Sequence, residues 1–79
     1  MTNPEKLTKA FSTALNISPS LVTDDLKYQG ITQWDSVTHM ILVAEIESVF
    51  DIAINTDDII DMSSVGKAKE IIKKYGVEL

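Results

Sequence analysis

The 79-residue sequence predicts an all-α protein: a four-helix bundle with a long loop between the first two helices and a short third helix. Apolar residues recur at spacings of three and four in three stretches, as in helices with one buried face. Residues that cap helix N-termini stand at or just before the expected starts of these helices. The only segment that alternates like a strand, residues 50–54, has no second strand to pair with.

The length allows a single domain over residues 1–79, near the lower limit for folding without metals or disulfides. Such a chain buries only about 60% of its unfolded surface, which leaves little for a deep substrate cavity, so we do not expect an enzyme. The absence of cysteine excludes thiolate chemistry and fits a reducing cytoplasm. Without a signal-peptide pattern or a long apolar run, the chain is expected to be a cytoplasmic monomer that does not insert into membranes.

Charge is distributed unevenly. The net charge is −5, from seven lysines and twelve acidic residues. Residues 28–66 contain seven acidic residues and no lysine or arginine, so the middle of the chain carries −7 and the ends together carry +2. Such a field repels nucleic acid and anionic membranes and favours a basic protein surface as the partner.

The first helix is expected from about Pro4 to Leu15, with Thr2 or Asn3 as its cap. Its apolar face consists of Leu7, Phe11, Ala14 and Leu15. Residues 16–35 are rich in turn-forming residues and predict an ordered loop, in which a short helical turn is compatible with the pattern. The residues expected to hold this loop to the core are Leu21, Val22, Leu26, Tyr28 and Ile31.

The second helix contains the most strongly amphipathic stretch, residues 39–50. Its core stripe consists of His39, Leu42, Val43, Ile46, Val49, Phe50 and Ala53. A second stripe begins apolar and becomes polar: Val37, Met40, Ile41, Ala44, Glu47, Ser48 and Asp51. A helix with two apolar faces must bury both or offer one to a partner. Trp34, just before this helix, is expected to pack over the loop and the helix.

The third helix is expected to be one or two turns long, with Asn55 or Thr56 as its cap and Asp57 and Asp58 in its first turn. Its predicted buried side is Ile59, Ile60 and Met62. The fourth helix should begin at Ser63 or Ser64 and end at Gly76. Its predicted buried residues are Val65, Ala68, Ile71 and Ile72.

Ser36 stands where the long loop meets the second helix, in Trp34-Asp35-Ser36-Val37. Backbone N–H groups at a helix start lack partners within the helix, so an anionic phosphate would be favoured there. A hydroxyl at this position is well placed to carry a covalently attached group.

The order of these features resembles the acyl carrier protein family over nearly the whole chain. The matching residues are Asp35-Ser36-Val37, Phe50-Asp51, Ile54 and Ser64-Val65. The resemblance implies that Ser36 bears 4′-phosphopantetheine from coenzyme A, whose thiol holds acyl or aminoacyl groups as thioesters. It also implies as partners a phosphopantetheinyl transferase, an acyl- or amino-acid-activating enzyme, and a downstream transferase or synthase.

Partner enzymes are expected to recognise a face near Ser36. The predicted face consists of Asp35, Val37, Ile41, Glu45 and Glu47, extended by Asp57 and Asp58. The sequence departs from the carriers of fatty-acid synthesis, in which acidic residues are common soon after the serine and a small residue often precedes the Asp-Ser pair. The Trp-Asp-Ser start resembles discrete carriers of specialised pathways, including D-alanyl, polyketide, nonribosomal-peptide and surface-polysaccharide carriers. Ordinary core packing is expected for Val43, Ile46, Ile59 and Met62, although they could shelter a short cargo.

Three alternatives to a carrier can be drawn from the sequence. An unmodified interaction module would use the apolar start of the second helix to bind a partner helix. A small hydrolase would need Ser36 and His39 as a nucleophile and its base, but no third group clearly orients the imidazole. A calcium loop beginning at Asp51 fails because Ala53, Thr56 and Met62 stand where an oxygen ligand, glycine and glutamate are needed. We therefore expect no catalytic residue and no metal site.

Overall fold

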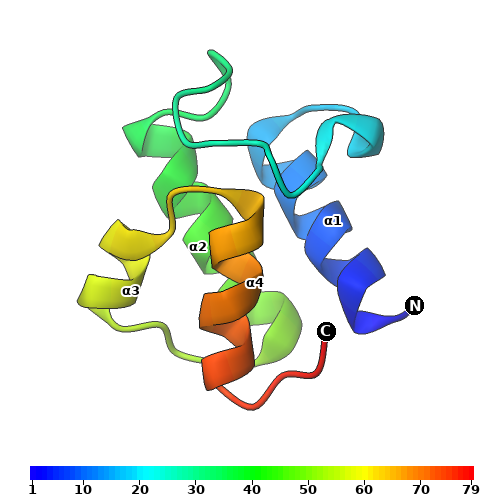
Figure 1. The fold of residues 1–79 in the computed structure, drawn as a ribbon, viewed down its shortest axis with the longest axis vertical. Coiled ribbons are helices and arrows are strands. Elements are labelled where there is room, and N and C mark those ends of the chain that lie inside the picture. The colour runs from blue at the N-terminus through cyan, green and yellow to red at the C-terminus, as the bar shows by residue number, and fades with distance from the viewer.

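The computed structural model describes all 79 residues, as four α-helices and one short 3-10 helix without a β-sheet (Figure 1). The elements are α1 (Asn3–Leu15), η1 (Pro19–Leu21), α2 (Ser36–Phe50), α3 (Thr56–Asp61) and α4 (Val65–Lys74). The short α3 lies at the edge of the molecule, and the long loop crosses one end of the bundle. The predicted fold class is confirmed. None of the helices is long and apolar enough to cross a lipid bilayer.

Each α-helix begins at a side chain that accepts a hydrogen bond from its first turn. Thr2 and Glu5 form a reciprocal capping box at α1. Asp35, Asn55 and Ser64 cap α2, α3 and α4. These short-range hydrogen bonds explain why the sequence predicted the helix starts well.

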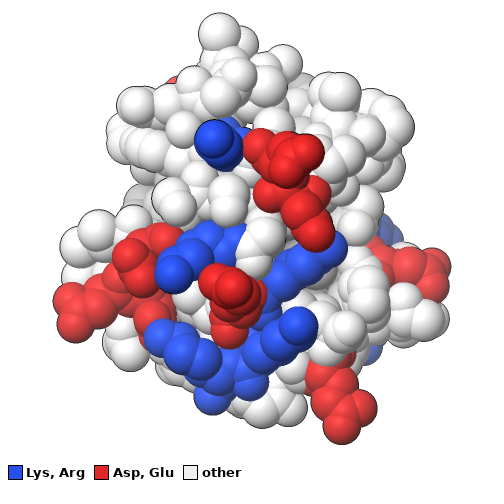
Figure 2. All heavy atoms as spheres, viewed as in Figure 1, with Lys and Arg blue, Asp and Glu red and all other residues white.

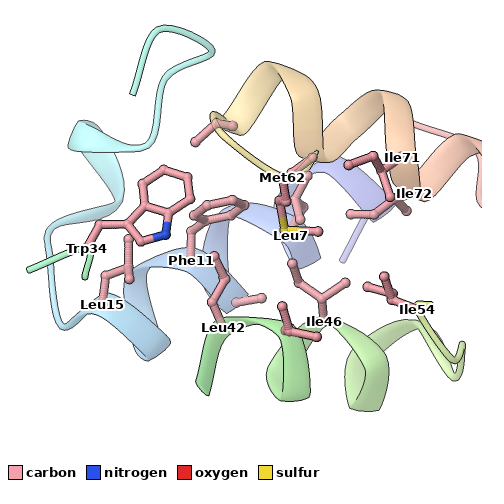
Figure 3. Close-up of a cluster of buried hydrophobic side chains, with 14 residues drawn as sticks. Leu7, Phe11, Leu15, Trp34, Leu42, Ile46, Ile54, Met62, Ile71 and Ile72 are labelled. Atoms are coloured by element: carbon pink, nitrogen blue, oxygen red, sulfur yellow. The ribbon is translucent and has the colours of Figure 1, made fainter. Parts of the chain in front are cut away.

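One apolar core holds the helices together (Figure 3). Trp34 is fully buried in it, and its indole meets the Phe11 ring edge-on with the ring centroids 5.4 Å apart. Trp34 also meets the Tyr28 ring of the loop and donates to His39 of α2, which confirms its expected packing over the loop and that helix. Further core residues, all predicted, are Leu7, Phe11, Leu15, Leu42, Val43, Ile46, Val65, Ala68, Ile71 and Ile72.

Backbone hydrogen bonds fasten the long loop to the start of α4. The Tyr28 N–H donates to the Ser63 carbonyl over 2.9 Å, and the Val65 N–H donates to the Leu26 carbonyl over 2.9 Å. The helical turn compatible with the loop sequence is η1. Leu21, expected to help hold the loop, is instead 50% exposed, because it lies at the end of this outer turn.

Three expectations about apolar faces were wrong. Ala53, predicted on the core stripe of the second helix, is exposed, because α2 ends at Phe50. Ile60 is 76% exposed, because in the two-turn α3 the inward positions are taken by its neighbour Ile59 and by Met62 just beyond the helix. The α2 helix is less amphipathic than expected, since Val37, Met40 and Ile41 carry its apolar character onto the solvent side. Part of the apolar surface is therefore left without an intramolecular partner.

We predict that Leu42→Ala and Ile60→Ala have very different effects on stability. Leu42 is fully buried, so Leu42→Ala should lower the free energy of unfolding by about 2–5 kcal/mol through lost burial and a cavity. Ile60→Ala should change it by less than about 0.5 kcal/mol. Urea unfolding followed by circular dichroism measures both, and equal losses would contradict the assigned orientation of α3.

Candidate functional site

Ser36 is the first residue of α2, and it is exposed. The hydrogen bonds around this helix start are made by Asp35 and Thr38, and none involves the Ser36 hydroxyl. Thr38 Oγ1 donates to the Gln33 carbonyl over 2.7 Å and accepts from the Asp35 N–H over 2.9 Å. The chain on both sides of Ser36 is therefore fixed, while its hydroxyl is free to react.

The Asp35 carboxylate accepts hydrogen bonds from two of the N–H groups that were expected to favour a phosphate at this helix start. Its Oδ1 accepts from the Val37 N–H over 3.0 Å and from the Thr38 N–H over 2.9 Å. The Thr38 N–H, with smaller help from the Thr38 hydroxyl and the Val37 N–H, holds the pKa of Asp35 below its usual value against a partial desolvation that raises it. Two of the N–H groups at the helix start are thus already bonded and do not favour an anionic group on Ser36.

A hydrogen-bonded bridge runs through His39, one turn after Ser36. Trp34 Nε1 donates to His39 Nδ1 over 3.0 Å, and His39 Nε2 lies 2.8 Å from the Ile59 carbonyl oxygen. An indole nitrogen can only donate, so Nδ1 accepts and Nε2 carries the hydrogen that reaches Ile59. Both ring nitrogens are engaged, and neither is free to take a proton from Ser36 in the way that a hydrolase would require.

An apolar groove of about 410 Å³ opens beside Ser36, between the long loop, α2 and α3. Its lining residues are Tyr28, Ser36, His39, Met40, Ile59, Ile60, Met62 and Ser63. Tyr28, Met40 and Ser63 line the groove although their place there was not predicted. The turn-forming residues of the loop do not indicate that the loop comes close to α3. In the sequence, only Trp34 and His39, five residues apart, could have suggested a contact between the loop and α2.

The predicted recognition residues do not all share one surface. Val37 is 68% and Ile41 50% exposed, and the exposed Met40 and Ala44 lie beside them on α2. We call these four residues the apolar strip. Glu45 is half-buried and borders a hollow next to Lys6 and Lys9 of α1.

Besides Asp35, two more acidic residues of the predicted face have intramolecular partners. The half-buried Glu47 accepts the Ile54 N–H on Oε2 over 2.8 Å, which stabilises the link between α2 and α3. Asp58 is only 6% exposed, whereas its neighbour Asp57 is exposed. Asp58 therefore does not extend an exposed face as the sequence analysis expected.

Asp58 instead ties α3 to the end of α4. Its carboxylate accepts from Lys74 Nζ and from the Tyr75 hydroxyl, each over 2.6 Å. The hydrogen bond from Lys74 has the largest effect in lowering the pKa of Asp58, and the bond from Tyr75 lowers it further. The same bonds raise the pKa values of Lys74 and Tyr75. The Tyr75 oxygen also accepts the Asn55 N–H over 3.0 Å, so the cap of α3 belongs to the same network.

Basic side chains gather on another part of the surface. Figure 2 shows them over α4, in the view of Figure 1, with acidic side chains between them. The pairs include Lys67 with Asp61 at 3.8 Å and Lys69 with Asp24 at 2.6 Å. The apolar strip contains neither basic nor acidic residues.

The fold and the site define a class: a small helical bundle that presents a free serine hydroxyl at a helix start, beside an apolar groove. The chain is 31% identical over 70 residues to an acyl carrier protein from Lactobacillus johnsonii, and the match covers 89% of this chain and 88% of that protein. No family model and no solved structure matches the chain. On the similarity to this relative, the chain belongs to the acyl carrier protein family.

We predict that the contribution of Asp58 to stability is lost in acid. Because its pKa is lowered in the folded state, its charged form stabilises the fold above the ordinary aspartate value of 3.8, and this stability disappears as the pH falls through the lowered pKa. Asp58→Asn should therefore be less stable than the wild type at pH 7, and the gap should close below about pH 4.

Thermal unfolding between pH 7 and pH 2 measures this gap. The matched control is Asp57→Asn, which removes an exposed charge from the same helical turn and should have the smaller effect at pH 7. A gap for Asp58→Asn that stayed constant down to pH 2 would show that the charge of Asp58 is not what stabilises the fold.

Proposed function

We propose that this protein is a discrete carrier that holds acyl or aminoacyl intermediates as thioesters on 4′-phosphopantetheine attached to Ser36. The observation that carries the proposal is the free, exposed Ser36 hydroxyl on a rigid helix start, in a chain of the acyl carrier protein family. A separate transferase can reach such a hydroxyl, and the serine needs no activating base within its own chain.

The residues around Ser36 fit a phosphopantetheine arm. The arm supplies a thiol, which the cysteine-free chain lacks, and with it an activated thioester. Asp35 and Thr38 hold the helix start that presents the attachment point. The groove that begins at Ser36 offers mainly apolar side chains, among them Met40 and Ile60, along which the arm can lie.

We assign the carrier to a specialised biosynthetic pathway in the cytoplasm, where it acts as a monomer. Its partners would be a phosphopantetheinyl transferase, an acyl- or amino-acid-activating enzyme, and a downstream transferase or synthase. The apolar strip, which carries no charge, and the Trp34–His39 pair support a role outside ordinary fatty-acid synthesis. On the recognition face we retain Asp35, Val37, Ile41, Glu45 and Asp57, with Glu47 at its edge, and leave out the buried Asp58.

A second candidate function is an unmodified interaction module. It is favoured by the exposure of Val37, Met40 and Ile41, which a partner helix could cover without any prosthetic group. The two functions differ in what they require of Ser36.

Attachment is tested by intact mass after incubation with coenzyme A and phosphopantetheinyl transferases. The wild type should gain one phosphopantetheinyl unit and Ser36→Ala none, because the variant lacks the oxygen that forms the phosphodiester. Ser48→Ala, a change of an exposed serine in the same helix, should gain the unit like the wild type. No gain by the wild type with cognate transferases would favour the unmodified module.

Partner recognition is tested with two substitutions of equal exposure. Ile41 and Leu21 are each 50% exposed, but only Ile41 lies on the apolar strip. Ile41→Asp should weaken binding to the transferase by about tenfold or more, since a buried apolar contact is replaced by a charge. Leu21→Asp should leave affinity within about twofold, and similar losses for both would argue against the strip as the binding surface.

A further inference from the structure

The α3 helix is joined to α2 by a single side-chain hydrogen bond, from His39 Nε2 to the Ile59 carbonyl oxygen over 2.8 Å. The other polar anchors of α3, Asp58 and Asp61, reach α4 rather than α2. The bond through His39 therefore spans the gap between the two helices that border the groove.

The His39 ring is held in place from two further sides. Trp34 Nε1 donates to Nδ1, and the two rings lie nearly parallel with their centroids 6.1 Å apart. The Tyr28 ring meets the imidazole edge-on with centroids 5.3 Å apart. Because Trp34 is fully buried, turning the His39 ring away from Ile59 would leave a buried N–H without a partner.

The position of His39 in α2 determines which residues of this helix lie deeper in the bundle than its ring. Ser36, His39 and Val43 follow one another at helical spacings of three and four, so they lie along one side of the helix. Ser36 and His39 line the groove, whereas Val43 and Ile46, 2% and 0% exposed, line none of the molecule's hollows. On the α3 side the groove reaches the buried Met62, but along this side of α2 it does not pass His39.

We propose that His39 is a specificity-determining residue of the carrier: its bridge to Ile59 closes the way from Ser36 to the apolar interior between α2 and α3. The proposal rests on the proposed attachment of the arm to Ser36. Cargo on the arm stays in the open groove, along Met40 and Ile60, and the residues Val43 and Ile46 remain ordinary core.

This closure selects the chemical class of the cargo. A short or polar acyl or aminoacyl group needs no interior pocket and is accommodated at the surface. Each methylene beyond the end of the groove would remain in water, so a long acyl chain gains no further protection from the carrier. The cargo assigned by the structure is therefore a short or polar acid.

The experiment compares carriers loaded with acetyl, butyryl, hexanoyl, octanoyl and decanoyl groups, each transferred with its pantetheine arm from the corresponding acyl-coenzyme A. Intact mass verifies the loading, and carbon-13 methyl NMR then follows Val43 and Ile46 in the interior and Met40 and Ile60 in the groove. In the wild type, the signals of Val43 and Ile46 should stay at their acetyl positions throughout the series, while those of Met40 and Ile60 move.

Two variants test whether His39 is the cause. In His39→Ala, the signals of Val43 and Ile46 should begin to move as the acyl chain lengthens. The pair Trp34→Phe with His39→Leu removes donor and acceptor together and nearly keeps their volume, so it should fold even where His39→Ala does not, and its interior signals should also move. The matched control is Met40→Ala, which alters the groove but not the bridge and should leave the interior signals unchanged.

The outcomes separate the two proposals. Movement of the Val43 and Ile46 signals in octanoyl-loaded wild type would overturn the closure, although the carrier function would stand. Interior signals that stay fixed in a folded variant lacking the bridge would overturn the role of His39. No gain of mass at all would overturn the carrier function and the closure with it.

Discussion

The junction between the long loop and α2 is the constraint on which the rest of the site depends. Trp34 is fully buried, and two residues later Ser36 is exposed, so the chain must turn sharply outward between them. Asp35 fixes this turn, because its carboxylate accepts the N–H groups of Val37 and Thr38. Because the segment is short and is held by Asp35 and Thr38, the Ser36 hydroxyl has little freedom to move away from the groove. The hydroxyl itself makes no hydrogen bond that stabilises the fold.

The groove beside Ser36 owes its shape to polar contacts more than to apolar packing. The short α3 directs Ile60 into solvent and buries Ile59 only in part. Besides the packing of Ile59 and Met62, it is held by the His39 bond at one side and by the bonds of Asp58 to Lys74 and Tyr75 at the other. Because hydrogen bonds are directional while apolar contacts are not, this arrangement fixes the orientation of a helix that is too short to be stable by itself.

The features that the sequence predicted correctly are those decided within a few residues. The caps Thr2, Asn55 and Ser64 bond to N–H groups of the next turn, and the apolar stripes of α1 and α4 repeat with the helical period. At the site, the misses concern residues whose partners are distant in the chain. Asp58 has the pattern of an exposed first-turn acid, but Lys74 and Tyr75, 16 and 17 residues away, draw it inward. The bond of His39 to Ile59 spans 20 residues, and no local pattern contains it.

The acidic residues near Ser36 act differently at long range and at contact. The carboxylates of Asp35 and Glu47 accept backbone N–H groups, which stabilises them but does not cancel their charge, so they still contribute to the field that an approaching partner feels. In α3, Asp58 is paired with Lys74 at 2.6 Å and Asp61 with Lys67 at 3.8 Å. On the proposed recognition face, Val37 and Ile41 are exposed and neither carries charge. In the proposed carrier, attraction over distance and contact at the surface would come from different residues, so ionic strength should act mainly on the rate of association and much less on the rate of dissociation.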